Sequence, residues 1–278
     1  MALEPTSYTS LHVSLSDDRR VAMLRFEHGK ANEVGTDVLR ELERLVADLE
    51  HDDDVVALVT TSTRVSNRGT PLFVAGANVT ERAGWTDDQV MAHVRWQRGV
   101  LRGLRHAPVF HVVVVGGVAL GWGTEYMLTA DWRIAVPGAV FGLPETGLGI
   151  LPGAGGTAEL WSHIGVAQTL RLGMTGERIG PEEARDIGLV QEVAADHDAG
   201  MERALALASR VAKASPTAVA AYKRAVLEAV GSDPEHRNTL EEQAYARCVR
   251  SGEAAVGRAN FAAIREGTRP PWGPKSGD

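Results

Sequence analysis

Short apolar runs and amphipathic helical stretches alternate through the first half of the chain. The runs at 55–63 and 109–119 are apolar throughout, which is typical of strands buried on both faces. Strands are expected at residues 11–16, 20–28, 55–63 and 109–119. Helical spacing of apolar side chains predicts helices over 35–53 and 86–106. This repeated order favours a layered α/β core with helices packed on sheet.

Strand signals fade after about residue 151, and successive amphipathic helices follow. After residue 151, only residues 189–195 are strand-like. Before it, a short strand with a turn is expected over 132–145. The helices are expected at residues 156–165, 167–174, 181–189, 201–214, 216–231 and 234–266. We therefore divide the chain into an α/β core (1–195) and a helical C-terminal region (196–278), with no linker between them.

Composition and charge narrow the classes of partner. The 278 residues are 44% hydrophobic and 23% charged, as in an ordinary globular protein with a substantial core. The formal net charge of −7 argues against nucleic acid as a partner. The N-terminal residues lack the features of a signal peptide, and no apolar run approaches the roughly 20 residues that span a bilayer. We expect a soluble, cytoplasmic protein that does not bind membranes, with Cys248 as a structural thiol.

Several common catalytic motifs are absent from the sequence, namely a Walker A loop, HExxH, paired CxxC and GxSxG. Nothing in the sequence indicates a metal site. The stretch beginning at Gly147 is rich in glycine, but Pro152 occupies the last glycine position of a dinucleotide fingerprint. A nucleotide cofactor of the Rossmann type is therefore not expected.

Three glycine-rich stretches each combine an acidic residue with small residues that can leave backbone N–H groups accessible to a ligand. Residues 73–81 (FVAGANVTE) leave a strand through small residues, which either expose N–H groups or make a tight turn. In 117–125 (GVALGWGTE) a strand leads into a helix whose N-terminus suits a developing oxyanion. Glu125 then lies in the first turn, where the helix dipole alone also favours an acid. In 141–157 (FGLPETGLGILPGAGGT), Glu145 has no basic neighbour in sequence, so it is either an exposed turn residue or a catalytic acid.

In order and content, these stretches resemble the enoyl-CoA hydratase/isomerase (crotonase) family. That family has a GAD segment, a GxALGGGxE segment and a PE…LG…P…GG segment, which correspond here to AGAN, GVALGWGTE and PETGLGILPGAGGT. The stretches GKANEVGTDVLREL, GERIGPEEARDIGLVQEV and ASPTAVAAYKRAV extend the resemblance over about residues 10–265. It implies an α/β fold, with a crotonase-like layered β-β-α core and a C-terminal helical region that covers the active site. It also implies a homotrimer or homohexamer.

The resemblance assigns roles to four positions. The backbone N–H groups of Ala77 and Trp122 are implied to hold the thioester oxygen of an acyl-CoA. Glu125 is implied to activate a water for attack on C3, and Glu145 to deliver a proton to C2. Because two carboxylates that share a site cannot both ionise freely, one is expected to retain a proton. The implied enzyme is an enoyl-CoA hydratase, a hydro-lyase.

Coenzyme A is then part of the substrate, and no separate cofactor is expected. The residues implied to flank its adenine and pantetheine are Lys30, Ala31, Ala75, Gly76, Ala77, Asn78 and Val79. By its residue type alone, Lys30 could equally be a solvated surface lysine.

Two positions depart from the family pattern. Asn78 replaces the usual Asp, which changes the charge beside the oxyanion-binding Ala77. Trp122 replaces the middle glycine of the triplet. Its indole either fills or caps the acyl pocket, together with Tyr126 one helical turn on, or it packs in the core.

Two other functions stay open at this point. An enoyl-CoA isomerase or another thioester-enolate enzyme of the same family would use the same oxyanion site. A non-catalytic interaction subunit is the other alternative, although a subunit of that kind has no need for two acids in this arrangement. Acyl-chain length and pathway cannot be read from these motifs.

Overall fold

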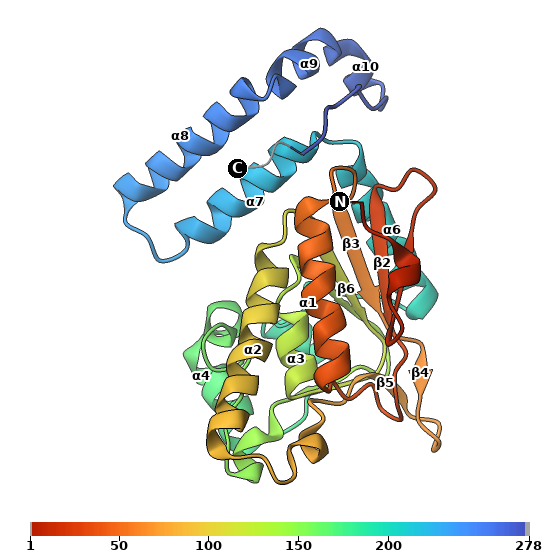
Figure 1. Cartoon of the computed structure of the whole chain (residues 1–278), viewed down its shortest axis with the longest axis vertical. Coiled ribbons are helices and arrows are strands. Elements are labelled where there is room, and N and C mark those ends of the chain that lie inside the picture. The colour runs from red at the N-terminus through yellow and green to blue at the C-terminus, as the bar shows by residue number, and fades with distance from the viewer. Residues whose placement is uncertain (1, 276–278) are drawn as a thin grey trace.

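Two β-sheets stacked in layers form the centre of the molecule (Figure 1). The computed structural model describes residues 2–275. The larger sheet has the order β1 (Leu11–Leu15), β2 (Val21–Phe26), β3 (Ala57–Thr61), β6 (Phe110–Val115), β8 (Trp132–Ala135) and β10 (Glu192–Val193). The smaller sheet has the order β4 (Arg64–Val65), β5 (Pro71–Val74), β7 (Val118–Leu120) and β9 (Val140–Gly142). The pairs β1–β2 and β4–β5 are antiparallel, and all other neighbours are parallel.

The chain passes from one sheet to the other within single apolar runs. The expected strand over 109–119 is in fact β6 followed by β7, and these two strands belong to different sheets. The crossing occurs at Gly117, where a Cβ atom would lie 2.3 Å from the backbone carbon of Pro71, so only glycine fits. The run over 132–145 likewise divides into β8 and β9. These crossings produce the layered β-β-α core, which confirms the predicted fold class.

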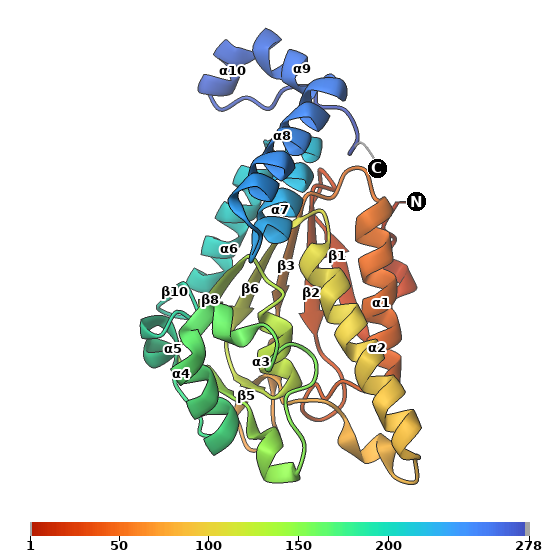
Figure 2. The same cartoon turned by 90° about the vertical axis from the view of Figure 1, so that its left-hand side faces the viewer.

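Helices cover both faces of the larger sheet (Figures 1 and 2). On one side lie α1 (Thr36–His51), α2 (Asp87–His106) and α3 (Trp122–Met127), and on the other lies α6 (His197–Ala212). The apolar face predicted for α1 is buried at Val38, Leu42, Leu45 and Leu49. Thr86 begins α2 with a reciprocal capping box to Gln89, which satisfies two backbone N–H groups. One apolar core therefore lies under α1–α3 and a second under α6.

The remaining helices are short segments around the core and a group at one end of the molecule. They are η1 (Pro5–Ser7), η2 (Val79–Arg82), η3 (Pro144–Leu148), α4 (Leu160–Thr175, kinked at Gly165), α5 (Pro181–Asp186), α7 (Pro216–Ala229), α8 (Pro234–Arg250), α9 (Glu253–Ala259) and α10 (Phe261–Arg265). None of the described helices combines the length and apolar character needed to cross a lipid bilayer.

The C-terminal region is not the single long helix expected over 234–266. Gly252, at φ +86°, ends α8 because this backbone conformation is left-handed and cannot continue a right-handed helix. Helix α8 packs along α7, and α8–α10 lie at one end of the molecule, away from α3, which lies in its lower half (Figures 1 and 2). Within one chain, then, these helices extend away from the predicted site.

Candidate active site

The backbone N–H of Ala77 is free to point toward a ligand. A parallel bridge joins Ala77 to Val34, in which the N–H of Val34 donates to the Gly76 carbonyl and the N–H of Asn78 donates to the Val34 carbonyl. In this pattern the N–H of the bridged residue itself faces away from its partner strand. The N–H of Ala77 therefore faces away from Val34, toward the other side of this segment.

The second predicted donor, Trp122, is the first residue of α3. The first N–H groups of a helix have no acceptor within the helix and carry the positive end of its dipole. Gly121 precedes it at φ +52° and ψ −118°, a conformation suited to glycine. Gly123 packs so close to β5 that a Cβ atom would lie 2.1 Å from the Val74 carbonyl oxygen. These two glycines bring the start of α3 against the strand that leads to Ala77.

The indole of Trp122 packs in the core. It is 2% exposed and lies 5.5 Å from the ring of Tyr126, at an interplanar angle of 32°. Tyr126 is itself buried among Phe26 and Phe73, and its hydroxyl lies 3.0 Å from the Thr60 hydroxyl. The structure thus supports the packing interpretation of Trp122, whose side chain anchors α3 in the core.

We expect Trp122→Ala to lower the free energy of unfolding by about 3–5 kcal/mol, because it leaves a large cavity in a packed core. Chemical denaturation measures this loss. Trp161→Ala is the matched control, since that indole is 51% exposed and its removal should cost less than about 1 kcal/mol. Equal losses for the two variants would contradict the core position of Trp122.

Glu125 lies in the first turn of α3, as predicted, and is 3% exposed. Its Oε1 accepts hydrogen bonds from the N–H groups of Ala154 (2.7 Å) and Gly156 (2.9 Å). Burial raises the pKa of Glu125, while these N–H groups and the charge of Arg98 oppose the rise because they stabilise the carboxylate. Glu125 is therefore a buried acid whose charged form has specific backbone support.

Glu145 has a different environment, although it is close to the same site. It follows β9 in η3, and its Oε1 would lie 2.4 Å from a Cβ atom on Gly121. Its Oε2 is buried and has no hydrogen-bond partner among the described residues. Burial, with a further contribution from the charge of Glu125, raises the pKa of Glu145 to about 7. Burial thus raises the pKa of both acids, and the pKa of Glu145 lies close enough to neutral pH for this carboxyl to retain a proton there.

The raised pKa of Glu145 predicts a pH-dependent effect on stability. The folded protein binds this proton more tightly than the unfolded chain, so the contribution of Glu145 to wild-type stability falls as pH rises from about 4.5 to about 7. Glu145→Gln removes the buried charge. We expect its melting temperature relative to wild type to increase between about pH 5 and about pH 8. Scanning calorimetry at the two pH values tests this, and a difference that is constant with pH would contradict it.

The two segments predicted to flank coenzyme A lie side by side. The N–H of Ala75 donates to the Ala31 carbonyl at 3.1 Å, which joins the Lys30–Ala31 loop to the segment ending at Val79. Lys30 and Val79 are exposed, whereas Gly76 is buried. Asn78 accepts a hydrogen bond from the Thr80 hydroxyl at 2.6 Å, so its amide oxygen provides the acceptor for this loop although the usual Asp is absent.

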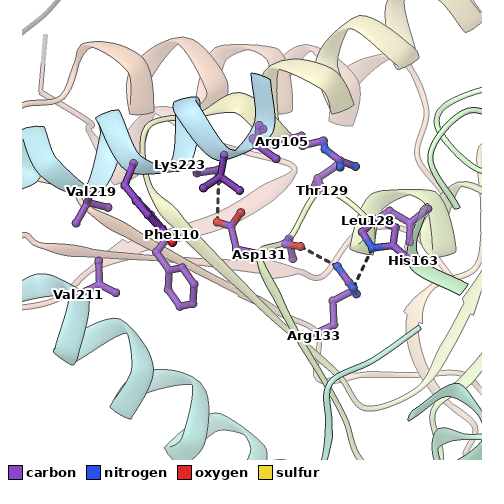
Figure 3. Close-up of a pocket in the computed structure, with 14 residues that line it drawn as sticks. Arg105, Phe110, Leu128, Thr129, Asp131, Arg133, His163, Val211, Val219 and Lys223 are labelled. Atoms are coloured by element: carbon purple, nitrogen blue, oxygen red, sulfur yellow. Dashed lines mark hydrogen bonds and ion pairs between the residues drawn. The ribbon is translucent and has the colours of Figure 1, made fainter. Parts of the chain in front are cut away.

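Two cavities border α3, and only one contains a predicted catalytic residue. The first, of about 520 Å³, lies between α2 and residues 151–159 and is lined by Glu125. The second, of about 500 Å³, lies under α7 (Figure 3). Its polar side chains bind one another. Lys223 pairs with Asp131 at 2.8 Å, and Arg133 contacts His163 at 3.3 Å, so they serve the packing of α7 and β8.

Sequence reasoning missed two parts of the site. The N–H groups of Ala154 and Gly156 bind Glu125, and Arg98 on α2 lies in the same cavity. Gly156 also permits the turn, since a Cβ atom there would lie 2.6 Å from the side chain of Pro152. The glycine run marked the turn, but nothing in its spacing indicated that it would hold Glu125. Within residues 2–275, no group of three or more His, Cys, Asp or Glu side chains is placed to hold a metal ion.

Comparison with known proteins gives the family. The model of the enoyl-CoA hydratase/isomerase family matches residues 17–274. The chain is 31% identical to the short-chain-enoyl-CoA hydratase of Clostridium acetobutylicum, over 85% of this chain and 89% of that one. It is 35% identical to the mitochondrial enoyl-CoA hydratase domain-containing protein 2 of Mus musculus, over 83% and 77%. The crystal structure of enoyl-CoA hydratase from Bacillus anthracis superposes with a TM-score of 0.85 at 30% identity, covering 95% of this chain and 99% of that one. The chain belongs to the enoyl-CoA hydratase/isomerase family.

Proposed function

We propose that this protein is an enoyl-CoA hydratase, which adds water across the 2,3 double bond of an enoyl-CoA thioester. The observation that carries the proposal is a pair of acids with raised pKa values beside the start of α3, with Glu125 buried in its first turn and Glu145 half-buried against Gly121. Glu125 has N–H donors that favour its carboxylate, and Glu145 has a pKa of about 7 and an unpartnered oxygen. Hydration needs one base and one acid at the same time.

In this mechanism the Glu125 carboxylate removes a proton from a water molecule, whose oxygen bonds to C3. The electrons of the double bond move toward the thioester, and the negative charge gathers on its oxygen. The N–H groups of Ala77 and Trp122 stabilise that charge, each by about 3–4 kcal/mol in sites of this type. Glu145 then gives its proton to C2. Proton exchange with solvent restores both acids.

Coenzyme A is bound in this proposal as part of the substrate, along the surface from Lys30 to Val79. The exposed side chains of this segment suit a bulky, mostly solvated ligand, and the Lys30 ammonium suits a phosphate group of coenzyme A. No further cofactor takes part, since every proton transfer is assigned to Glu125, Glu145 or water.

A second candidate within the family is a shift of a 3,4 double bond to the 2,3 position. Glu145 favours it, because a carboxyl with a pKa of about 7 can both take and return a proton at neutral pH. Isomerisation of this kind would need Glu145 alone and no bound water.

Product analysis separates these functions. We expect crotonyl-CoA to be converted to 3-hydroxybutyryl-CoA, detected by mass and by loss of enoyl-thioester absorbance. Conversion of 3-hexenoyl-CoA to 2-hexenoyl-CoA without any hydrated product would support the isomerase instead. Absence of both reactions together with absence of CoA binding would support a non-catalytic subunit.

We also propose a homotrimer or homohexamer. The support is the position of α8–α10 far from α3 in their own chain, together with large exposed apolar side chains on them, including Tyr245, Val249 and Phe261. Helices placed in this way could cover a site only on a neighbouring subunit. Sedimentation velocity should give a trimer or a multiple of it, and a stable monomer would contradict the assignment.

A further inference from the structure

The cavity beside Glu125 has an unusual charge for a place where an acyl chain would lie. One wall is α2, and Arg98, Leu101, Arg102 and Arg105 all line the cavity from this helix. Their spacing of three and four residues puts them on one helix face, spread along about 10 Å of the axis. His106 adds a fourth nitrogenous side chain. The wall opposite the 151–159 loop is therefore strongly basic.

Among the described residues, the acids of the cavity form an ion pair with only one arginine of this wall, Arg105. Glu159 pairs with Arg105 at 2.9 Å, and Glu125 is held by backbone N–H groups. Arg98 donates through Nε to the Gly153 carbonyl at 2.9 Å, which fixes the guanidinium at the cavity without using a charge partner. Neither Arg98 nor Arg102 forms an ion pair within the described part of the chain. Two guanidinium groups thus remain available to an anion.

The position of the cavity indicates which part of a substrate would reach it. Of the four predicted catalytic residues only Glu125 lines it, so under the proposed function the cavity begins at the base that faces C3 and not at the oxyanion site. The surface expected to bind coenzyme A, from Lys30 to Val79, contributes none of its lining residues. The part of the acyl group beyond C3 is what can extend along α2, past the apolar Leu101 and Leu128 and toward Arg102.

We propose that this cavity binds the distal end of an acyl group that ends in a carboxylate, and that Arg98 and Arg102 select it. The inference rests on the proposed function and gives its substrate class: CoA monothioesters of unsaturated dicarboxylic acids. A guanidinium presents parallel N–H donors that match both oxygens of a carboxylate, which an alkyl tail cannot satisfy. An alkyl tail would also displace water from these charges without replacing its hydrogen bonds.

The test compares two thioesters of equal chain length, 2-hexenedioyl-CoA and 2-hexenoyl-CoA. We expect kcat/KM for the carboxylate substrate to be higher by about tenfold to a hundredfold, as for one hydrogen-bonded charge pair. Arg102→Gln should lower this ratio by about tenfold or more, and Arg102→Glu should bring it below one. Arg95→Gln is the matched control, because Arg95 is an exposed arginine of α2 outside the cavity. A ratio taken within one variant does not depend on the fraction of folded enzyme.

Binding of the saturated analogues adipoyl-CoA and hexanoyl-CoA, measured by calorimetry, keeps this inference separate from the hydratase assignment. Tighter binding of adipoyl-CoA that depends on Arg102 supports the anionic-tail site even if neither enoyl thioester is hydrated, in which case only the proposed function fails. The inference is wrong if wild type prefers the alkyl substrates. It is equally wrong if Arg102→Gln weakens both analogues and free CoA to the same extent, because the arginine would then serve the CoA phosphates.

Discussion

Glu125→Gln and Glu145→Gln are each expected to lower kcat for hydration of crotonyl-CoA by about 10²- to 10⁴-fold. Glutamine keeps the size of the side chain but can neither take the proton of water nor supply one to C2 with useful strength. The two losses should differ in pH dependence. The residual activity of Glu125→Gln should fall as pH rises, because Glu145 must be protonated to act as the acid, and the fall should be centred below about pH 7 because the charge of Glu125 no longer raises the pKa of Glu145.

Glu50→Gln is the control for these variants, since Glu50 is an exposed glutamate at the end of α1. Steady-state rates at saturating substrate, with circular dichroism to verify folding, give the comparison. Large loss in Glu145→Gln with near-normal hydration in Glu125→Gln would remove Glu125 from the mechanism and favour a single-acid reaction. The double variant should be little worse than the poorer single variant, because the two acids act in one transition state.

Gly121→Ala is expected to cost about 10²-fold or more in kcat while changing only one methyl group. A Cβ atom at this position would lie 2.4 Å from Glu145 Oε1, so the carboxyl must move. The backbone at φ +52° and ψ −118° is also unfavourable for alanine. A shift of about 1 Å in a reacting group can reduce a rate by about a hundredfold. The Trp122 N–H, which follows directly, would move with it.

Gly173→Ala serves as the control for this substitution, because nothing lies within 4 Å of a Cβ atom there and its φ is not positive. It should leave kcat unchanged and leave stability equal or slightly higher. If Gly121→Ala retained wild-type kcat, Glu145 would have to tolerate the displacement, which would argue against its role as the proton donor to C2.

Most of the fold could be predicted from hydrophobic patterning. The apolar periodicity of α1 and the predicted span of α2 over residues 86–106 correspond closely to the structure, because burial and capping act locally. The division of residues 109–119 between two sheets could not be predicted. An apolar run has the same pattern whether it stays in one sheet or crosses between two, and the close approach of Pro71 to Gly117 is a tertiary contact. The break of the last helix was signalled by Gly252, but a single glycine in a helical pattern is often tolerated.

The site was recoverable only in part. The family motifs indicated Glu125, Glu145, Ala77 and Trp122. The structure buries Glu125 and places half-buried Glu145 against Gly121, while the catalytic roles of all four residues stay predictions. The motifs did not indicate that the two acids would have different electrostatic environments. That difference comes from the N–H groups at Ala154 and Gly156, which reach Glu125 through folding of a distant loop. The sequence likewise did not predict that the arginines of α2 line a cavity, because a row of arginines on a helix usually only faces solvent.

The separation of Trp122 into a backbone facing the site and a side chain in the core affects how mutants at this position should be interpreted. Most replacements will leave a chemically competent N–H yet yield little active protein, so a survey of activity in cell extracts would mistake a folding defect for a catalytic one. Specific activity per folded molecule would instead remain close to wild type for any residue except proline, which alone removes the donor. The chemistry at this position is therefore indifferent to side-chain identity, and the constraint on it is imposed by the interior of the protein.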